Sequence, residues 1–339
     1  MKRLINLITL ISVGILITSP LHAQIEIKKL GQSTMNFLQV SLSPRGAALA
    51  DAYTAVGTGA DAIFYNPAGL AEFDGEFDAV FNMTQWIADI TYASGAFAWN
   101  MDVYGTVGLS YLVVDYGDIY ATTLLSEDAA ANDPQGYIDN GMMDNVGAYA
   151  LGISYSRFIS SQFLMGGSVR YVGQQLGESI LAAGPKTNEE NKLAFDVGLK
   201  YYLGFNKARF GVSIRNFATS VKYEEITAQL PLVFVLGVAM DLMDFASEEM
   251  SENHSLTLAT DFSHPNNYTE RVSVGLEYKF RNFISLRGGY QSNLDFGGLS
   301  AGFGLSTSSI VGENVEVNYS FSQFDTFDNV NRFSITLTF

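Results

Sequence analysis

The side chains that could carry out chemistry are few in this sequence. It has no Cys and only three His among 339 residues, so disulfides, thiolate metal sites and cysteine nucleophiles are excluded. His22 lies in a leader-like segment, which leaves His254 and His264. His264 follows Asp261 closely enough for a His–Asp pair, although a histidine in a solvated loop explains the same spacing. No HExxH, GxSxG, P-loop or Rossmann glycine pattern is present, so the sequence predicts no enzyme activity and no cofactor.

One acidic stretch could hold a hard cation through oxygen ligands. Its members are Glu127, Asp128, Asp133, Asp139 and Asp144. Their spacing does not match an EF-hand loop, and a solvated external loop would have the same composition. We therefore expect no metal site.

The overall composition restricts the class of protein. Charged residues make up 16% of the chain, against about 25% in a typical soluble domain, while aromatic residues reach 13% and there are 32 Gly. This balance does not fit a disordered chain. The net charge of −16 excludes nucleic acid as a partner, because few basic residues are available to neutralise phosphates. The length allows one large domain or two ordinary ones.

The N-terminus resembles a secretory signal. Lys2 and Arg3 precede a mostly apolar stretch, 4–17, and a plausible cleavage point follows Ala23. The alternative is a membrane anchor, but the apolar run is shorter than the roughly 20 residues that a spanning helix needs. We therefore expect residues 1–23 to be a signal peptide. The rest of the sequence contains no apolar run long enough for a transmembrane helix.

Most of the chain after residue 76 alternates between apolar and polar or small residues, the signature of β-strands. In the run 193–201, for example, the odd positions are Leu193, Phe195, Val197, Leu199 and Tyr201. The sequence contains about fourteen such segments. They cover 77–86, 89–99, 103–116, 145–158, 162–175, 192–203, 207–217, 231–242, 254–262, 270–280, 283–291, 298–307, 314–323 and 331–339.

The length of these segments favours a membrane barrel. Most have about 9–14 residues, whereas the mean strand of a soluble protein has about 5–6 and a tilted membrane-spanning strand about 9–11. An even number of long strands with one apolar face, ending on Phe339, matches an outer-membrane barrel. We expect residues 77–339 to form an all-β fold, a transmembrane barrel of about fourteen antiparallel strands in a Gram-negative outer membrane. A large soluble β-sandwich is the alternative.

The connections between the segments support this prediction. Outer-membrane barrels have short turns at one end and long loops at the other. The longest expected connections, 117–144 and 176–191, both follow odd-numbered strands, so strand one should run outward. Long connections at 243–253 and 308–313 break the rule, as does the short one at 87–88.

The strand positions opposite the apolar side carry charges of both signs. They are Arg170, Asp196, Lys200, Arg209, Arg215, Asp241, Asp261, Arg271, Glu277, Lys279, Arg287 and Glu316. Such groups are costly in hydrocarbon. We therefore expect them to line a wet or plugged lumen and to pair across it.

Residues 24–76 lack the alternation. Ser43 and Pro44 fit the start of a helix of small residues that would end at Gly57 and Gly59. A barrel of fourteen strands is too wide for its own side chains to fill, so this segment is expected to be a helical hatch or plug. The run Asn66, Pro67, Ala68, Gly69 is a candidate hatch motif and ligand-binding site, with an ordinary Asx–Pro turn as the alternative.

The same segment resembles a known family. Its motifs are Phe37-Leu38, Arg45, Ala47-Ala48-Leu49, Asp51-Ala52 and the run from Asp61 to Ala71. Together they resemble the start of the PorV/PorQ family, which is similar to the FadL-type fourteen-strand barrels. Ala50-Asp51 departs from the pattern, which would have a second glycine-containing pair there.

The resemblance implies two functional hypotheses. The first is a component of the type IX secretion system that holds or shuttles cargo proteins through its outer loops, where the apolar residues Leu124, Leu125 and the run 180–183 would be contact points. Packing of these residues onto the barrel mouth is the alternative. The second is a FadL-like transporter of long-chain fatty acids or other hydrophobic solutes. The charges expected in the lumen argue mildly against a greasy lumen but leave room for lateral exit near the hatch. The first hypothesis is favoured mostly by the family resemblance. Its partners would be outer-membrane lipid, secretion-system proteins and cargo.

Overall fold

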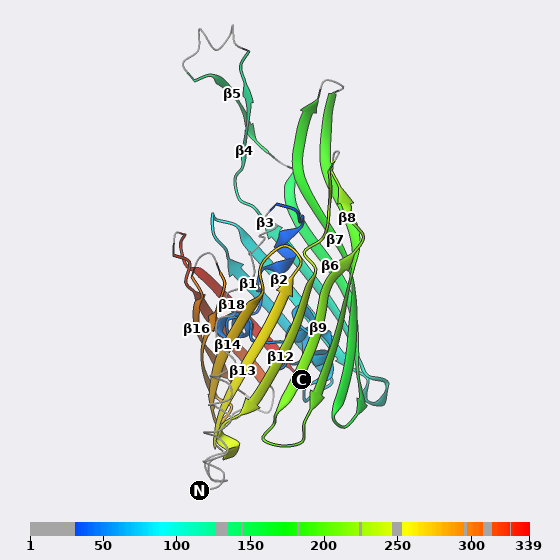
Figure 1. Cartoon of the computed structure of the whole chain (residues 1–339), viewed down its shortest axis with the longest axis vertical. Coiled ribbons are helices and arrows are strands. Elements are labelled where there is room, and N and C mark those ends of the chain that lie inside the picture. The colour runs from blue at the N-terminus through cyan, green and yellow to red at the C-terminus, as the bar shows by residue number, and fades with distance from the viewer. Residues whose placement is uncertain are drawn as a thin grey trace, which may run out of the picture.

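The computed structural model describes residues 31–126, 135–143, 145–181, 184–223, 226–245, 253–294, 297–307, 314–325 and 327–339. Fourteen antiparallel strands close into one barrel, with β1 paired to both β2 and β18 (Figure 1). The barrel strands are β1 (Phe77–Gln85), β2 (Thr91–Asn100), β3 (Thr106–Asp115), β6 (Val146–Ser160), β7 (Phe163–Leu181), β8 (Gly184–Tyr202), β9 (Arg209–Ala218), β12 (Val233–Asp241), β13 (His254–Pro265), β14 (Arg271–Phe280), β15 (Ile284–Gln291), β16 (Leu299–Ser306), β17 (Asn314–Ser322) and β18 (Val330–Thr338). The expected antiparallel barrel is confirmed.

Alternation along each strand separates the two faces of the wall. On β8 the outward side chains of Leu193, Phe195 and Val197 are 53%, 42% and 51% exposed, whereas Asp196 and Lys200 are buried inside. The apolar residues therefore cover the outside of the barrel and the charged ones face its interior, as the period of two requires. No helix in the described ranges is long and apolar enough to span a membrane.

The predicted loop at 176–191 is wrong. β7 runs to Leu181 and β8 starts at Gly184, so these two strands continue as a paired ribbon above the rest of the rim (Figure 1). The ladder continues without the regular alternation of apolar and polar residues, because a ribbon standing clear of the barrel has no apolar face to bury. Of the run 180–183, Ala182 and Ala183 lie outside the described residues.

The expected loop at 117–144 also contains a ribbon. β4 (Tyr120–Leu124) pairs only with β5 (Tyr137–Met142), and the pair stands apart from the barrel at the end where the long connections gather. We call this end the loop end and the opposite one the turn end. A smaller pair, β10 (Val221–Lys222) and β11 (Thr227–Ala228), lies between β9 and β12. Short helices η4 (Asp102–Tyr104) and η5 (Met243–Phe245) lie in turn-end connections.

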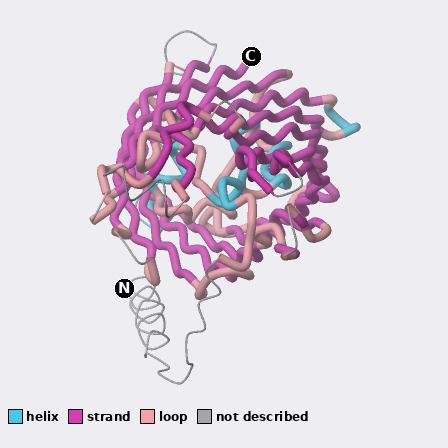
Figure 2. The backbone as a smooth tube through the Cα atoms, turned by 90° about the horizontal axis from the view of Figure 1, so that it is seen from above, coloured by secondary structure: helices cyan, strands magenta, loops and turns pink. Residues whose placement is uncertain are grey.

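Residues 31–76, the lumen segment, fold inside the ring of strands (Figure 2). Their elements are η1 (Asn36–Gln39), α2 (Pro44–Ala48), η2 (Ala60–Phe64) and η3 (Pro67–Ala71). Ser43 caps α2 by accepting a hydrogen bond from the Gly46 N–H, as the sequence predicted. The helix ends at Ala48, however, and does not continue to Gly57.

The early end of α2 has a local cause. Ala50 and Asp51 have φ angles of 52° and 66°, in the left-handed region that glycine adopts most easily. They are the pair that departs from the family pattern by carrying no glycine. The chain therefore makes a strained turn here, and the residues after it form turns instead of a helix.

Candidate functional site

The wall holds the lumen segment by its backbone. Polar wall side chains donate to its carbonyl groups in place of helical hydrogen bonds. These contacts are Ser156 Oγ to Ala68 O (2.7 Å), Ser213 Oγ to Tyr65 O (2.7 Å), Arg215 Nη1 to Phe64 O (2.8 Å), Arg209 Nε to Ala55 O (3.0 Å), Lys200 Nζ to Gly57 O (2.9 Å) and Arg332 Nε to Ser41 O (2.8 Å). Buried carbonyls need such partners. Arg209 and Arg215 were expected to pair across the lumen and instead bind this backbone.

Other luminal charges do form ion pairs. Arg170 Nε lies 2.7 Å from Asp196 Oδ2 on the neighbouring strand, and Lys207 Nζ lies 3.5 Å from Asp241 at the turn end. Lys200, which is fully buried, also pairs with Glu72 of the lumen segment. These wall charges therefore compensate each other or anchor the segment.

The strongest anchor joins Arg45 of the lumen segment to the wall. Arg45 Nε and Nη2 donate to the two oxygens of Glu277 at 2.9 and 2.8 Å. Glu277 Oε1 also accepts from Arg287 Nε at 2.6 Å, and Arg287 reaches Glu316 at 3.2 Å. This bidentate, buried network ties α2 to β14, β15 and β17.

Glycines of the wall let the segment approach closely. At these inward-facing positions any larger side chain would collide with the lumen segment. We call this set of glycines the glycine ring. Its members and their contacts are Gly108 with Ile63, Gly166 with Pro67, Gly198 with Asn66, Gly211 with Thr54, Gly237 with Ala55, Gly275 and Gly289 with Leu49, and Gly302 with Ala48. The segment is thus seated around most of the barrel circumference.

The Asn66–Gly69 motif belongs to this packing. Asn66 is fully buried and caps η3, its Oδ1 accepting from the Ala68 N–H at 3.1 Å. Its Nδ2 donates to Thr54 O at 2.9 Å and to Leu199 O at 3.1 Å. A side chain at Gly69 would meet the Gly57 carbonyl. These polar groups are bonded to the protein itself, and a ligand role for Asn66, Pro67, Ala68 and Gly69 stays a prediction.

A packed cluster of apolar side chains, which we call the apolar chamber, occupies the loop-end half of the lumen. The inward faces of β2, β3, β6, β7 and β8 form its wall with Tyr92, Leu112, Val114, Ala148, Ala150, Val172 and Ala194. Met35, Phe37, Leu38 and Leu42 of the lumen segment fill it, together with Val221 and Leu230 from the β9–β12 connection. The interior is therefore apolar on this side of the barrel, in addition to the charged positions that the sequence predicted.

The sequence does indicate this apolar interior, although assigning odd and even strand positions to opposite faces did not reveal it. Runs such as Leu112-Val113-Val114 and Ala148-Tyr149-Ala150-Leu151 are apolar at both parities. A strand that is apolar on both faces has to bury both. Here one face lies on the outside of the barrel and the other in the chamber.

A polar cavity of about 530 Å³ lies at the turn end, below the lumen segment. Arg45, Tyr53, Asp61 and Glu316 are among the residues that line it. Asp61 Oδ2 accepts from Ser43 Oγ at 2.5 Å and from the Tyr53 hydroxyl at 3.0 Å. Burial raises the pKa of Asp61, and the hydrogen bonds from Ser43 and Tyr53 offset only part of this rise.

The raised pKa of Asp61 predicts that the lumen segment loosens as the pH rises. The folded chain holds this proton more tightly than the unfolded chain, in which Asp titrates at about pH 4. The resulting stabilisation is complete below that pH and is lost as the pH rises through the raised pKa. Asp61→Asn, which cannot ionise, should lose less stability than the wild type between pH 4 and pH 7, measured as the urea midpoint. Asp74→Asn, an exposed position, is the control. Equal pH profiles for wild type and Asp61→Asn would contradict the assignment.

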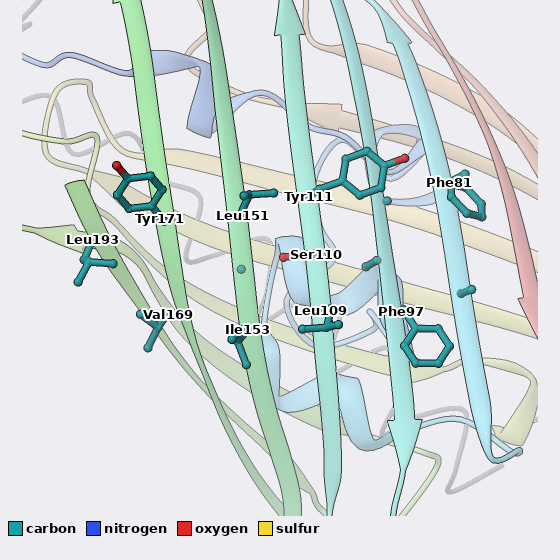
Figure 3. A pocket seen from close by; sticks show the side chains of 14 residues that line it. Phe81, Phe97, Leu109, Ser110, Tyr111, Leu151, Ile153, Val169, Tyr171 and Leu193 are labelled. Atoms are coloured by element: carbon teal, nitrogen blue, oxygen red, sulfur yellow. The ribbon is translucent and has the colours of Figure 1, made fainter. Parts of the chain in front are cut away.

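The outer wall carries an apolar groove of about 670 Å³ (Figure 3). Its lining side chains come from β1, β2, β3, β6, β7 and β8 and include Phe81, Phe97, Leu109, Tyr111, Leu151, Ile153, Val169, Tyr171 and Leu193. The β1–β2, β2–β3 and β3–β6 ladders behind it run in continuous register. The groove is therefore a recess in the outer face and does not open into the lumen through these ladders.

The histidines do not form a catalytic pair. Asp261 faces inward and accepts from the Tyr53 and Thr54 N–H groups, whereas the exposed His264 contacts Glu270 at 3.1 Å. His254 Nδ1 lies 2.7 Å from the Tyr278 hydroxyl. Within the described ranges no group of three or more His, Asp or Glu could hold a metal ion. Of the acidic stretch only Asp139 lies among the described residues; Glu127, Asp128, Asp133 and Asp144 lie outside them.

Comparisons with known proteins support the fold. No protein-family model matches the chain, and no curated protein matches it. The toluene transporter TbuX of Ralstonia pickettii is similar in structure, with a TM-score of 0.57, 12% identity and coverage of 88% of this chain and 98% of TbuX. The toluene transporter TodX of Pseudomonas putida has a TM-score of 0.55 at 14% identity, covering 86% and 96%.

A FadL homologue of Pseudomonas aeruginosa is similar as well, with a TM-score of 0.51, 12% identity and coverage of 88% and 98%. At these identities the comparisons define the class of fold, a FadL-like fourteen-strand barrel. The finer resemblance to PorV/PorQ stays a prediction.

Proposed function

We propose that this chain is an outer-membrane barrel that takes up hydrophobic small molecules. The observation that carries the proposal is the apolar chamber at the loop end, filled by residues of the lumen segment and of the β9–β12 connection. Apolar inner walls are unusual in membrane barrels, whose interiors are polar. The similar structures are named as toluene transporters and as a FadL homologue, which supports the same class of solute.

The proposal includes the cellular location. The exposed apolar side chains on the outside of the barrel would contact outer-membrane lipid, with the loop end outward. A cleaved signal peptide at residues 1–23 would direct the chain there. In this orientation the chamber lies on the side of the medium that supplies the solute, and the lumen segment, as a hatch, separates it from the turn-end cavity.

A second candidate is the type IX secretion role, favoured by the β4–β5 ribbon. Leu124 is 85% exposed and lies directly opposite Tyr137, which is 43% exposed, and Ile138 is 51% exposed. Leu125 follows at the end of β4. A two-stranded ribbon alone is marginally stable in water, so a protein partner would stabilise it. Cargo or another secretion component would be that partner.

One deletion strain separates the two candidates. We expect loss of uptake of radiolabelled toluene or oleate, restored by the wild-type gene, with surface display of secreted proteins unchanged. Loss of display with normal uptake would favour secretion and contradict transport. A gene lacking the β4–β5 ribbon should restore uptake in full if transport is the function.

Enlarging the chamber should raise uptake. In Phe37→Ala the ring no longer competes with the solute for the apolar wall, and burial of such a side chain is worth about 2 kcal/mol. We expect the initial rate of toluene uptake at low concentration to rise by up to roughly tenfold. Phe205→Ala, in an exposed turn-end connection, is the matched control and should leave the rate unchanged. An unchanged or reduced rate in Phe37→Ala, with normal barrel levels, would contradict a route through the chamber.

A further inference from the structure

A second cavity lies on the other side of the lumen segment from most of the chamber wall. It has a volume of about 60 Å³ and is bordered by β9, β12, β13, β14 and β15. Arg215 and Arg271 border it from the wall, and Asp51 and Leu38 border it from the lumen segment. Leu38 is therefore shared between this cavity and the apolar chamber.

The two arginines lack acidic partners. Among the residues that the structure describes, neither lies within 4 Å of a carboxylate oxygen, in contrast to Arg170, Arg45 and Arg287. Arg215 donates one hydrogen bond, to Phe64 O, and the Arg271 guanidinium lies 4.6 Å from the Tyr268 ring centre. The Nε atoms of both are buried without a hydrogen-bond partner. A guanidinium has five N–H donors, so several remain unused here.

The charges around the cavity do not balance. Arg215, Arg271 and Arg332 share Asp51 as an electrostatic neighbour, and Arg332 is bonded to a backbone carbonyl and a hydroxyl. Asp261 borders the cavity too, but its Oδ2 accepts the Tyr53 and Thr54 N–H groups. Asp196 also acts on Arg215 but is paired with Arg170, so four arginines against three aspartates leave one positive charge uncompensated. Isolated buried charges are costly, and water would satisfy the donors without neutralising that charge.

We propose that this cavity binds one small monovalent anion, chloride or a small carboxylate, between Arg215 and Arg271. The volume suits a group of this size with a few water molecules and is too small for a long acyl chain. The anion would accept from the terminal N–H groups of the two guanidinium groups that border the cavity. Because Leu38 and Gln39 cover the cavity, binding would also hold the loop-end part of the lumen segment in place.

This inference is independent of the solute that the chamber takes. The test uses the purified full-length barrel in neutral detergent at constant ionic strength, with sodium gluconate, which is too large for the cavity, replaced stepwise by sodium chloride or sodium acetate. The measurement is the midpoint temperature of unfolding. In the wild type we expect the midpoint to rise and saturate. In Arg271→Gln and Arg215→Gln the half-saturating concentration should increase about tenfold or more, since charge-assisted contacts are lost. Arg281→Gln, in an exposed turn, is the control and should behave as the wild type.

A bromide soak of wild-type crystals gives a readout that needs no variant, and an anomalous peak is expected between Arg215 and Arg271. Ordered water alone at that position would overturn the proposal. So would an anion-independent midpoint in the wild type, or the same rise in Arg271→Gln. Stabilisation by laurate but not by acetate would also overturn it, because the site would then accept a tail-bearing ligand.

Discussion

Gly289→Val will displace the lumen segment and make the barrel leak. A Cβ atom at Gly289 would lie 2.5 Å from the Leu49 carbonyl carbon and 2.7 Å from the Ala50 nitrogen, and both atoms are backbone that cannot rotate away. Overpacking of this kind costs about 1–3 kcal/mol. We expect the urea midpoint to fall accordingly, vancomycin sensitivity of the cells to increase, and the single-channel conductance of the purified barrel to rise above that of the wild type.

The adjacent glycine provides a matched control. Gly288 faces outward on the same strand, and a Cβ there would meet nothing nearer than the Ser300 carbonyl at 4.0 Å. Valine suits a lipid-facing strand position, so Gly288→Val should keep the wild-type midpoint and conductance. If both variants fold with identical stability and neither conducts, the glycine ring does not seat the segment.

The strand pattern was readable from the sequence because each strand faces two different environments. On β8 the apolar Leu193, Phe195 and Val197 alternate with polar or charged inward residues such as Asp196. Such alternation can be recognised in one strand without knowing which strand pairs with it. The β7–β8 extension was missed for the same reason, since a ribbon clear of the barrel keeps its ladder without an apolar face.

The contacts that hold the lumen segment could not be predicted from the sequence, because they join distant parts of the chain. Nothing local distinguishes the inward Gly289 from the outward Gly288, since only the position of Leu49 makes one of them indispensable. Likewise, Arg209 and Arg170 look alike in sequence, yet one binds a backbone carbonyl and the other pairs with Asp196. The role of each group is set by its neighbour across the lumen.

Glu277→Gln should destabilise the barrel more than any other single charge removal in the lumen. The change leaves the Arg45 and Arg287 guanidinium groups without their shared carboxylate, and Glu277 and Arg287 are both buried. Removing one member of a buried ion pair costs about 3–5 kcal/mol, because the remaining charge stays desolvated. We expect a matching drop in the free energy of unfolding from urea titration. Trypsin should also cut after Arg45, which the wild type protects.

Glu270→Gln tests whether this effect comes from burial. Glu270 contacts His264 at the surface, where the two side chains are 46% and 58% exposed, and such pairs contribute about 1 kcal/mol or less. The two variants lose the same charge, so any difference between them measures the desolvated network around Arg45. Equal midpoints, with Arg45 still protected from trypsin in Glu277→Gln, would mean that the glycine ring alone holds the segment. In that case the ion pairs would be replaceable by apolar contacts of the same shape.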